Sequence, residues 1–148
     1  MDAALSPPDA RAVGAHMFAA DRASKGLGMT ITDLGEGTAT LTMTVREDML
    51  NGFDICHGGF ITTLADSAFA FACNSRNVVT VAAGLTVDFL APAHGGDVLT
   101  AAASETSRAG RTGVYDIVVT NRAGARVALV RGRSHSLNRS VLPSKESA

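Results

Sequence analysis

The sequence predicts an α+β domain in which an antiparallel sheet of five to six strands wraps around one long central helix, with an additional N-terminal helix. Three observations predict this class. Apolar and polar residues alternate over residues 38–45, as in a strand with one buried face. An almost continuous apolar stretch lies within residues 51–75, which is typical of a buried helix. Four more strand-like segments, joined by short turns, favour an antiparallel sheet.

The N-terminal helix is predicted from a start signal and a repeat. Ser6 is the predicted N-cap, followed by two prolines in the first turn and by Asp9. Apolar residues then recur at helical spacing, at Ala10, Val13, Met17 and Ala20. Because glycines at 26 and 28 end the pattern, we expect a helical extension over residues 1–26.

A β-hairpin is predicted after this extension. The apolar members of its second strand are Ala39, Leu41, Met43 and Val45, and four threonines alternate with them. Met29 and Ile31 stand before the break at residues 35–37 and indicate the first strand of the hairpin.

The central helix is predicted from apolar residues that cover most of its circumference: Phe60, Ile61, Leu64, Ala65, Ala68, Phe69, Phe71 and Ala72. Asp66 interrupts this set, and its neighbours predict that it is substantially buried. A buried carboxylate costs free energy unless it is paired or used. A hydrogen bond to Ser67, to Thr63 or to nearby backbone is one explanation, and a functional role is the other.

The remaining strands are predicted over segments that begin near Gly84, Asp97, Arg111 and Ala125. Residues 138–148 are polar, and we expect a flexible tail there. The 148 residues suit a single domain.

Composition excludes several classes of protein. The net charge of −1 argues against a nucleic-acid surface, and no uncharged apolar run is long enough for a membrane span. The N-terminus has no basic and apolar signal segment, so we expect a cytoplasmic protein. The two cysteines are expected to be free thiols, and the four histidines show no metal-ligand spacing.

Charge is unevenly distributed along the chain. Residues 1–107 carry 5 basic and 12 acidic side chains, whereas residues 108–148 carry 8 basic and 2 acidic ones. This asymmetry suggests an anionic ligand or partner near the C-terminal part, but the charge count alone favours solvated arginines on a strand face.

Residues 51–66 read N-G-x(4)-H-G-G-x(6)-D, and the segments "AAGLTVDFLAP" and "TGVYDI" follow. In these features the chain resembles the PaaI-like hotdog thioesterases over about residues 40–135. The resemblance implies a hotdog fold and hydrolysis of an aryl- or arylacetyl-CoA, such as phenylacetyl-CoA. It implies no metal and no cofactor, since coenzyme A is part of the substrate.

The resemblance also implies roles for the motif residues. Asp66 would be the general base for water, or a nucleophile that forms an acyl anhydride. The N–H of Gly58, at the start of the helix, would be the oxyanion hole, and Gly59 would let the substrate approach the backbone. Asn51 would orient the water or the carbonyl, and His57 would fix the loop or contact the thioester. A turn residue and a helix cap are the corresponding structural explanations of these two residues.

Gly58 and Asp66 are eight residues apart, which is roughly 12 Å along a helix. Both groups must lie about 3 Å from the reacting centre, so one helix cannot supply both. We therefore expect a symmetric dimer in which Gly58 of one chain faces Asp66 of the other. The resemblance implies the same shared sites, and pairing of two such dimers into a homotetramer.

Binding of the CoA part is predicted at the turn after the strand that begins near Asp97, where family members place CoA contacts. Its candidate residues are Arg108, Gly110, Arg111 and Thr112, and the planar guanidinium of arginine suits phosphate. Weaker candidates are Asn74 and Ser75 at the helix end, and Pro92 after the strand. The resemblance also implies that the Thr86 hydroxyl assists near the acid, although a threonine in a strand needs no such explanation.

Two other functions are weighed against thioester hydrolysis. An enoyl-CoA hydratase or dehydratase of this fold needs an Asp and a His five residues apart at the helix start, whereas Asp54 precedes His57 by three. A non-catalytic acyl-CoA binding module would keep the pocket, but it would have no use for a buried acid at position 66.

Overall fold

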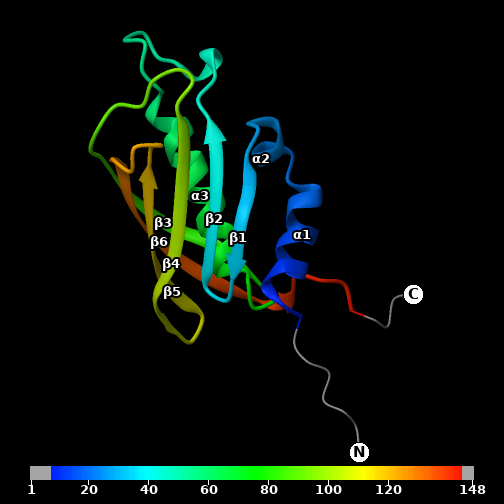
Figure 1. The fold of residues 1–148 in the computed structure, drawn as a ribbon. Helices are drawn as coiled ribbons and strands as arrows, with labels where there is room; N and C mark the ends of the chain where they lie inside the picture. Colours follow the sequence, from blue (N-terminus) through cyan, green and yellow to red (C-terminus); the bar gives the residue numbers. More distant parts are fainter. Residues whose placement is uncertain (1–7, 145–148) are drawn as a thin grey trace, which may run out of the picture.

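A computed structural model describes residues 8–144 and contains one six-stranded antiparallel sheet wrapped around a long helix (Figure 1). The strand order is β1-β2-β4-β5-β6-β3, and every neighbouring pair is antiparallel. The predicted α+β class, with its central helix and N-terminal helix, is confirmed.

The N-terminal elements are α1 (Ala10–Ala20), α2 (Arg22–Gly26), β1 (Thr30–Gly35) and β2 (Thr38–Thr44). A short 3-10 turn (Glu47–Met49) leads to the central helix α3 (Gly58–Cys73). The last strands are β3 (Val78–Phe89), β4 (Val98–Ala109), β5 (Thr112–Thr120) and β6 (Arg126–Ser140).

The start of the N-terminal helix differs from the prediction. The N-cap of α1 is Asp9, whose carboxylate accepts the N–H of Ala12 at 2.9 Å, and Ser6 lies outside the described residues. Asp is as good an N-cap as Ser, and Asp9 directly precedes the first helical residue. The helix is also interrupted at Asp21, which caps the end of α1 and the start of α2.

The core lies between α3 and the concave face of the sheet. The apolar residues predicted for the hairpin strand, Ala39, Leu41, Met43 and Val45, are all buried. On α3, Leu64, Ala65 and Ala68 are fully buried, and Phe69 packs its ring against Tyr115 of β5 with centroids 5.4 Å apart. In the described part of the chain, no helix is both long and apolar enough to cross a lipid bilayer.

Two strands are longer than the sequence pattern indicates. β3 begins at Val78, before the alternating segment that starts at Gly84, and β6 continues to Ser140, past the predicted start of the tail at 138. The two extensions pair with each other, since Val78 lies opposite Ser140. Register shifts near Thr80 and Ala82 break the alternation there, which explains why the pattern did not reveal these ends.

Candidate active site

His57 caps the start of α3. Its Nδ1 accepts the N–H of Gly59 at 2.9 Å, so Nδ1 carries no proton and the ring proton is on Nε2. His57 is therefore a helix cap, which is the structural explanation given for it above. The bond also occupies the Gly59 N–H, which leaves Gly59 no backbone donor for a ligand.

The N–H of Gly58 remains available. The next two N–H groups of the helix, those of Gly59 and Phe60, donate to His57 Nδ1 and to the His57 carbonyl oxygen. Within residues 8–144 no hydrogen bond uses the Gly58 N–H. An unpaired N–H at a helix start carries part of the positive end of the helix dipole, so it can polarise a carbonyl.

Asn51 lies in the loop before the helix. Its Oδ1 accepts the N–H groups of Phe53 at 2.9 Å and of Ile55 at 3.4 Å, as in an Asx-type turn. Its side-chain NH2 makes no hydrogen bond with a described residue. Asn51 is thus a turn residue that keeps two free donors.

Asn51, Gly58 and Pro92 line one cavity of about 530 Å³, which we call the Gly58 cavity. Three predicted residues from three separate segments therefore meet at the start of α3. The same cavity includes Phe89, which lies in the quoted segment "AAGLTVDFLAP" but is not among the predicted site residues.

Asp66 lies at the middle of α3 and is partly buried, less than the sequence predicts for a core carboxylate. Its carboxylate has no hydrogen bond or ion pair to any residue between 8 and 144. Ser67 instead bonds to Ser24 at 2.8 Å, and Thr63 donates to the Gly59 carbonyl oxygen at 2.8 Å. Pairing of Asp66 with these side chains is therefore not found. Burial raises the pKa of the Asp66 carboxyl above its usual range.

Asp66 lines a second cavity, of about 490 Å³, which we call the Asp66 cavity. Its walls come from α1, α3 and the first half of β3, and they include Met17, Phe69 and Val81. Cys73 also reaches this cavity, but burial raises the pKa of its thiol to about 12, so it is protonated at neutral pH. Cys56 and Cys73 are both free thiols, as predicted.

Asn74 lines the Asp66 cavity but its amide is fully engaged. Nδ2 donates to the carbonyl oxygens of Ala70 and Thr80, and Oδ1 accepts the N–H of Thr80 at 2.8 Å. Asn74 thereby joins the end of α3 to β3.

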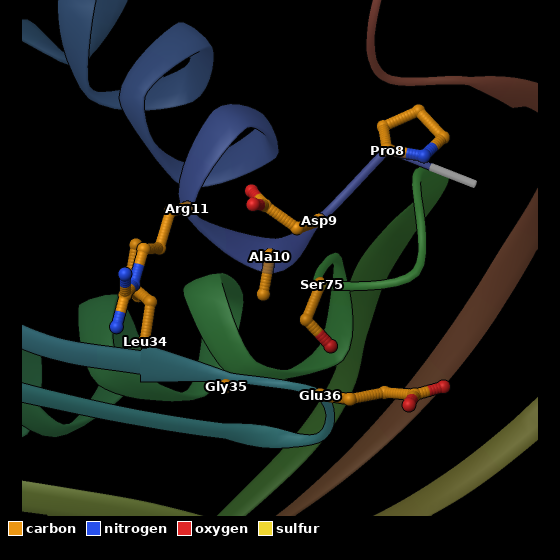
Figure 2. Close-up of a pocket in the computed structure, with 8 residues that line it drawn as sticks. All are labelled: Pro8, Asp9, Ala10, Arg11, Leu34, Gly35, Glu36 and Ser75. Atoms are coloured by element: carbon orange, nitrogen blue, oxygen red, sulfur yellow. The ribbon is translucent and has the colours of Figure 1, made fainter. Parts of the chain in front are cut away.

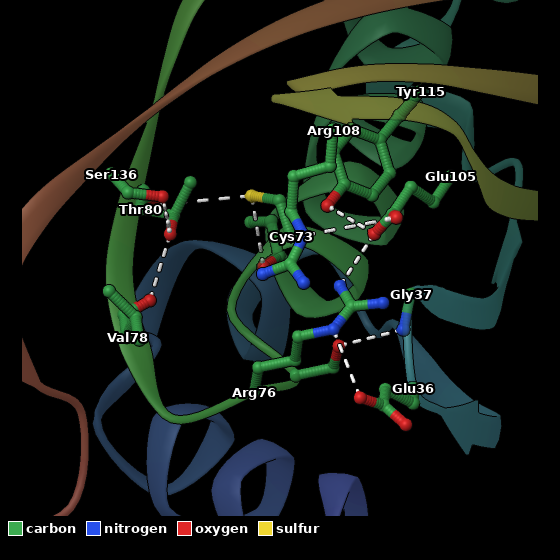
Figure 3. A network of polar contacts seen from close by, with 12 residues as sticks. Glu36, Gly37, Cys73, Arg76, Val78, Thr80, Glu105, Arg108, Tyr115 and Ser136 are labelled. Atoms are coloured by element: carbon green, nitrogen blue, oxygen red, sulfur yellow. Dashed lines mark hydrogen bonds and ion pairs between the residues drawn. The ribbon is translucent and has the colours of Figure 1, made fainter. Parts of the chain in front are cut away.

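The four residues predicted to bind CoA lie together around the β4–β5 turn. Arg108, Gly110, Arg111 and Thr112 line a cavity of about 230 Å³, which we call the arginine cavity. Figure 3 shows Arg108 beside an ion-pair network at the end of α3, in which Arg76 bridges Glu36 and Glu105. Arg108 approaches Glu105 only to 4.0 Å, and Arg111 forms no ion pair with a described residue, so both charges remain largely available.

Thr86 lies apart from these cavities. Its neighbours Leu85 and Val87 pack against the core, so Thr86 is on the opposite face of β3, where it is exposed and pairs with Arg131. The structure does not bring Thr86 near Asp66 of the same chain.

A further cavity, of about 390 Å³, lies between the start of α1 and the β1–β2 turn (Figure 2). It is lined in part by Asp9, Arg11 and Glu36, and the only predicted site residue among its lining residues is Ser75, one of the weaker candidates. No group of three or more His, Cys, Asp and Glu side chains is placed to hold a metal ion in the described ranges.

Gly58 and Asp66 of one chain line different cavities, as their spacing of eight residues on one straight helix requires. A single chain therefore presents an unpaired donor and an unpaired acid about 12 Å apart, too far for both to contact one reacting centre.

Comparison with known proteins gives consistent matches. A family model described as the thioesterase superfamily matches residues 53–128. The acyl-coenzyme A thioesterase PaaI of Escherichia coli is 46% identical over 125 residues, which cover 84% of this chain and 89% of that protein. A putative esterase of Archaeoglobus fulgidus is 33% identical over 128 residues, covering 86% of this chain and 83% of that protein.

Solved structures match the fold as well. The PaaI protein from the phenylacetic acid degradation operon of E. coli has a TM-score of 0.87 and 45% identity, covering 88% of this chain and 95% of that one. A mutant of the phenylacetic acid degradation protein PaaI from Thermus thermophilus has a TM-score of 0.76 and 36% identity, covering 79% and 100%. The sheet wrapped around α3 is therefore the hotdog fold that the sequence predicted.

Proposed function

The chain belongs to the thioesterase superfamily, and from this membership we propose that it hydrolyses the thioester of an acyl-coenzyme A to a free acid and coenzyme A. One observation carries the proposal. On a single helix, the Gly58 N–H and the Asp66 carboxylate both lack a partner among the described residues, and burial raises the pKa of Asp66. Unpaired groups of these two kinds are what hydrolysis of a thioester requires.

In this mechanism the Gly58 N–H donates to the thioester carbonyl oxygen and stabilises the negative charge that develops there. The Asp66 carboxylate either takes a proton from the attacking water or attacks the carbonyl carbon itself. On the first route the C–S bond breaks and Asp66 passes the proton it took from water to the sulfur, which leaves as the thiol of coenzyme A. On the second route the C–S bond breaks to give an anhydride on Asp66 and a thiolate; water then hydrolyses the anhydride, which restores the carboxylate and releases the acid, whose proton the thiolate takes. Water is the second substrate, and no metal or redox cofactor takes part.

The two groups meet only if two chains combine, and β3 is the strand through which two chains can pair. β3 is an edge of the sheet, and no described strand pairs with its free side. Four of the five most exposed large apolar side chains lie on β3 or directly after it: Val78, Val81, Phe89 and Leu90. An exposed apolar edge strand is a template for pairing with a second copy.

A two-fold axis through the middle of β3 would unite the two half-sites. In one chain, the end of β3 at Phe89 lies against Gly58, whereas its first half, at Val79–Ala82, lines the Asp66 cavity. Antiparallel pairing of β3 with its copy brings the end of one strand beside the beginning of the other. The Gly58 cavity then abuts the Asp66 cavity of the partner. We call this combination the shared site; pairing of two dimers into a tetramer stays a prediction.

The cavities also support a placement of the substrate. The Asp66 cavity has mainly apolar walls, including Phe69, Met17 and Val81, and its volume of about 490 Å³ suits an aryl or arylacetyl group. The relatives named for phenylacetic acid degradation support the same choice. Arg108 and Arg111 would hold the phosphates of coenzyme A. Both cysteines are free thiols, which is usual in a reducing compartment, so we place the reaction in the cytoplasm.

The proposal is tested by measuring free thiol released from a panel of acyl-CoAs, including phenylacetyl-CoA, by the wild type and by Asp66→Asn. We expect hydrolysis by the wild type and a loss of about 10²- to 10⁴-fold in kcat for the variant, because asparagine can neither accept the proton nor form the anhydride. Equal rates for the two proteins would refute the mechanism. Binding of acyl-CoA without any hydrolysis by the wild type would instead identify a binding module.

A further inference from the structure

We infer that Phe89 is a specificity-determining residue of the shared site, where its ring forms an aromatic wall beside the Gly58 N–H and favours substrates with an aromatic acyl group. This inference rests on the proposed function, since it concerns the same reaction. Phe89 belongs neither to the sequence motif nor to the polar residues of the site.

The first observation is the exposure of Phe89. Its strand neighbours Leu85 and Val87 face the same side and pack against the core. Phe89 continues this face past the edge of the core, and 55% of it stays exposed in the single chain. An exposed large apolar side chain at the end of a strand is most readily explained by something that covers it in the working protein.

The second observation is the contact with Gly58. A Cβ atom built on Gly58 would lie 2.8 Å, 3.1 Å and 3.3 Å from three carbons of the Phe89 ring. The tip of the ring therefore packs directly over the glycine whose N–H is unpaired. This position lets the ring exclude water from one side of that N–H, and exclusion of water strengthens a hydrogen bond to the developing oxyanion.

The third observation is the composition of the Gly58 cavity. Among the described residues, Phe89 is the only aromatic side chain that lines it, and its large apolar companions are Ile55, Ile61 and Leu90. An aromatic ring gains an offset or edge-to-face interaction with another ring beyond the gain from buried area. A straight acyl chain gains only the free energy of burying its apolar surface. The wall therefore favours an aryl group over an alkyl group of similar size.

A matched control exists in the loop that contains Asn51. Phe53 is 87% exposed, belongs to the loop before α3, and does not line the Gly58 cavity. Its backbone N–H, which bonds to Asn51, is retained in an alanine variant. Phe53→Ala thus removes an exposed ring near the site without touching the proposed wall.

The experiment measures kcat/KM for phenylacetyl-CoA and for hexanoyl-CoA with the wild type, Phe89→Leu, Phe89→Tyr and Phe53→Ala, with the melting temperature and the oligomeric mass of each. We expect the wild type to prefer phenylacetyl-CoA. In Phe89→Leu, which keeps an apolar wall without a ring, this preference falls by about threefold to tenfold. Phe89→Tyr and Phe53→Ala keep it.

Two results would overturn the inference: a wild type that does not prefer the aromatic substrate, or an unchanged preference in Phe89→Leu. An unchanged preference with an equal loss for both substrates would mean that the ring only supports the start of α3. If Phe89→Leu does not fold, loss of the preference in a folded Phe89→Tyr would also count against it. A wild type that hydrolyses neither substrate would refute the proposed function instead.

Discussion

Gly58 combines two properties that no other residue offers at the first position of α3. The absence of a side chain leaves room for the Phe89 ring, and its N–H has no partner within residues 8–144. These properties can be separated by substitution. Alanine keeps the N–H and adds a Cβ atom, whereas proline adds the same atom and removes the N–H.

We predict that Gly58→Pro lowers kcat by about 10²- to 10³-fold relative to Gly58→Ala, the usual effect of removing one oxyanion donor. Proline is well tolerated at the first position of a helix, and His57 already has the extended conformation required before proline, with φ −58° and ψ 132°. Both variants place a Cβ atom against the tip of the Phe89 ring, so the comparison separates loss of the donor from the effect of that added atom. Steady-state kinetics measure it, and similar kcat values would remove Gly58 from the mechanism.

Asp66 is a candidate catalytic group whose burial without a partner lowers the stability of the folded chain. Its carboxylate is partly buried and unpaired in the described chain, and burial raises its pKa in the folded state above the value near 3.9 of an unfolded chain. The folded protein therefore binds the proton more tightly than the unfolded chain. Stability contributed by the protonated acid is present below the unfolded pKa and is lost as the pH rises through the folded pKa.

It follows that Asp66→Asn should melt at a higher temperature than the wild type at pH 7, because the amide carries no charge to desolvate. The advantage should shrink as the pH is lowered from the raised pKa towards 4, where the wild-type acid becomes protonated. Calorimetric melting of both proteins over this range measures the effect. A less stable variant at pH 7 would show that the carboxylate has a stabilising partner in the assembled protein.

Regular elements with clear periodicity were predictable from the sequence. The buried face of β2 follows directly from the alternation of Ala39, Leu41 and Met43, and α3 follows from its apolar circumference. The start of α1 was missed because Ser6 and Asp9 are equally good caps. The start of β3 was missed because register shifts against β6 disturb its alternation.

The candidate site was predictable only in part. The motif identified Gly58 and Asp66, and the β4–β5 turn indeed gathers the predicted arginines around one cavity. The contact between Phe89 and Gly58 was not predictable, because it joins the end of a strand to the start of a helix 31 residues earlier in the chain. Periodicity reports which face of an element is buried, but not which element covers its end.

The free edge of β3 leads to a prediction about assembly. Val81→Lys should weaken or abolish the dimer, because a lysine on an edge strand disfavours pairing with a second strand. Light scattering would then report the mass of one 15.2 kDa chain, and hydrolysis should be lost with the dimer. Phe53→Lys, which charges a more exposed residue that does not belong to β3, should keep the wild-type mass. A Val81→Lys protein that stays dimeric would move the interface to another surface.

Three cavities of one chain hold separate parts of the proposed chemistry: a carbonyl-polarising donor, an acid beside an apolar chamber, and a pair of available arginines. The fold holds the donor and the acid apart because eight residues of helical rise separate them on α3. A two-fold axis at β3 is the simplest operation that joins the donor to the acid, and it does so twice in each dimer.

The most direct test of the shared site is a mixed dimer of an Asp66→Asn chain and a Gly58→Pro chain, isolated by a different affinity tag on each chain. One of its two sites combines the intact Gly58 of the first chain with the intact Asp66 of the second. The thiol-release assay should therefore give about half of the wild-type activity per dimer, while both parent homodimers stay nearly inactive. A mixed dimer no more active than its parents would contradict a site built from two chains.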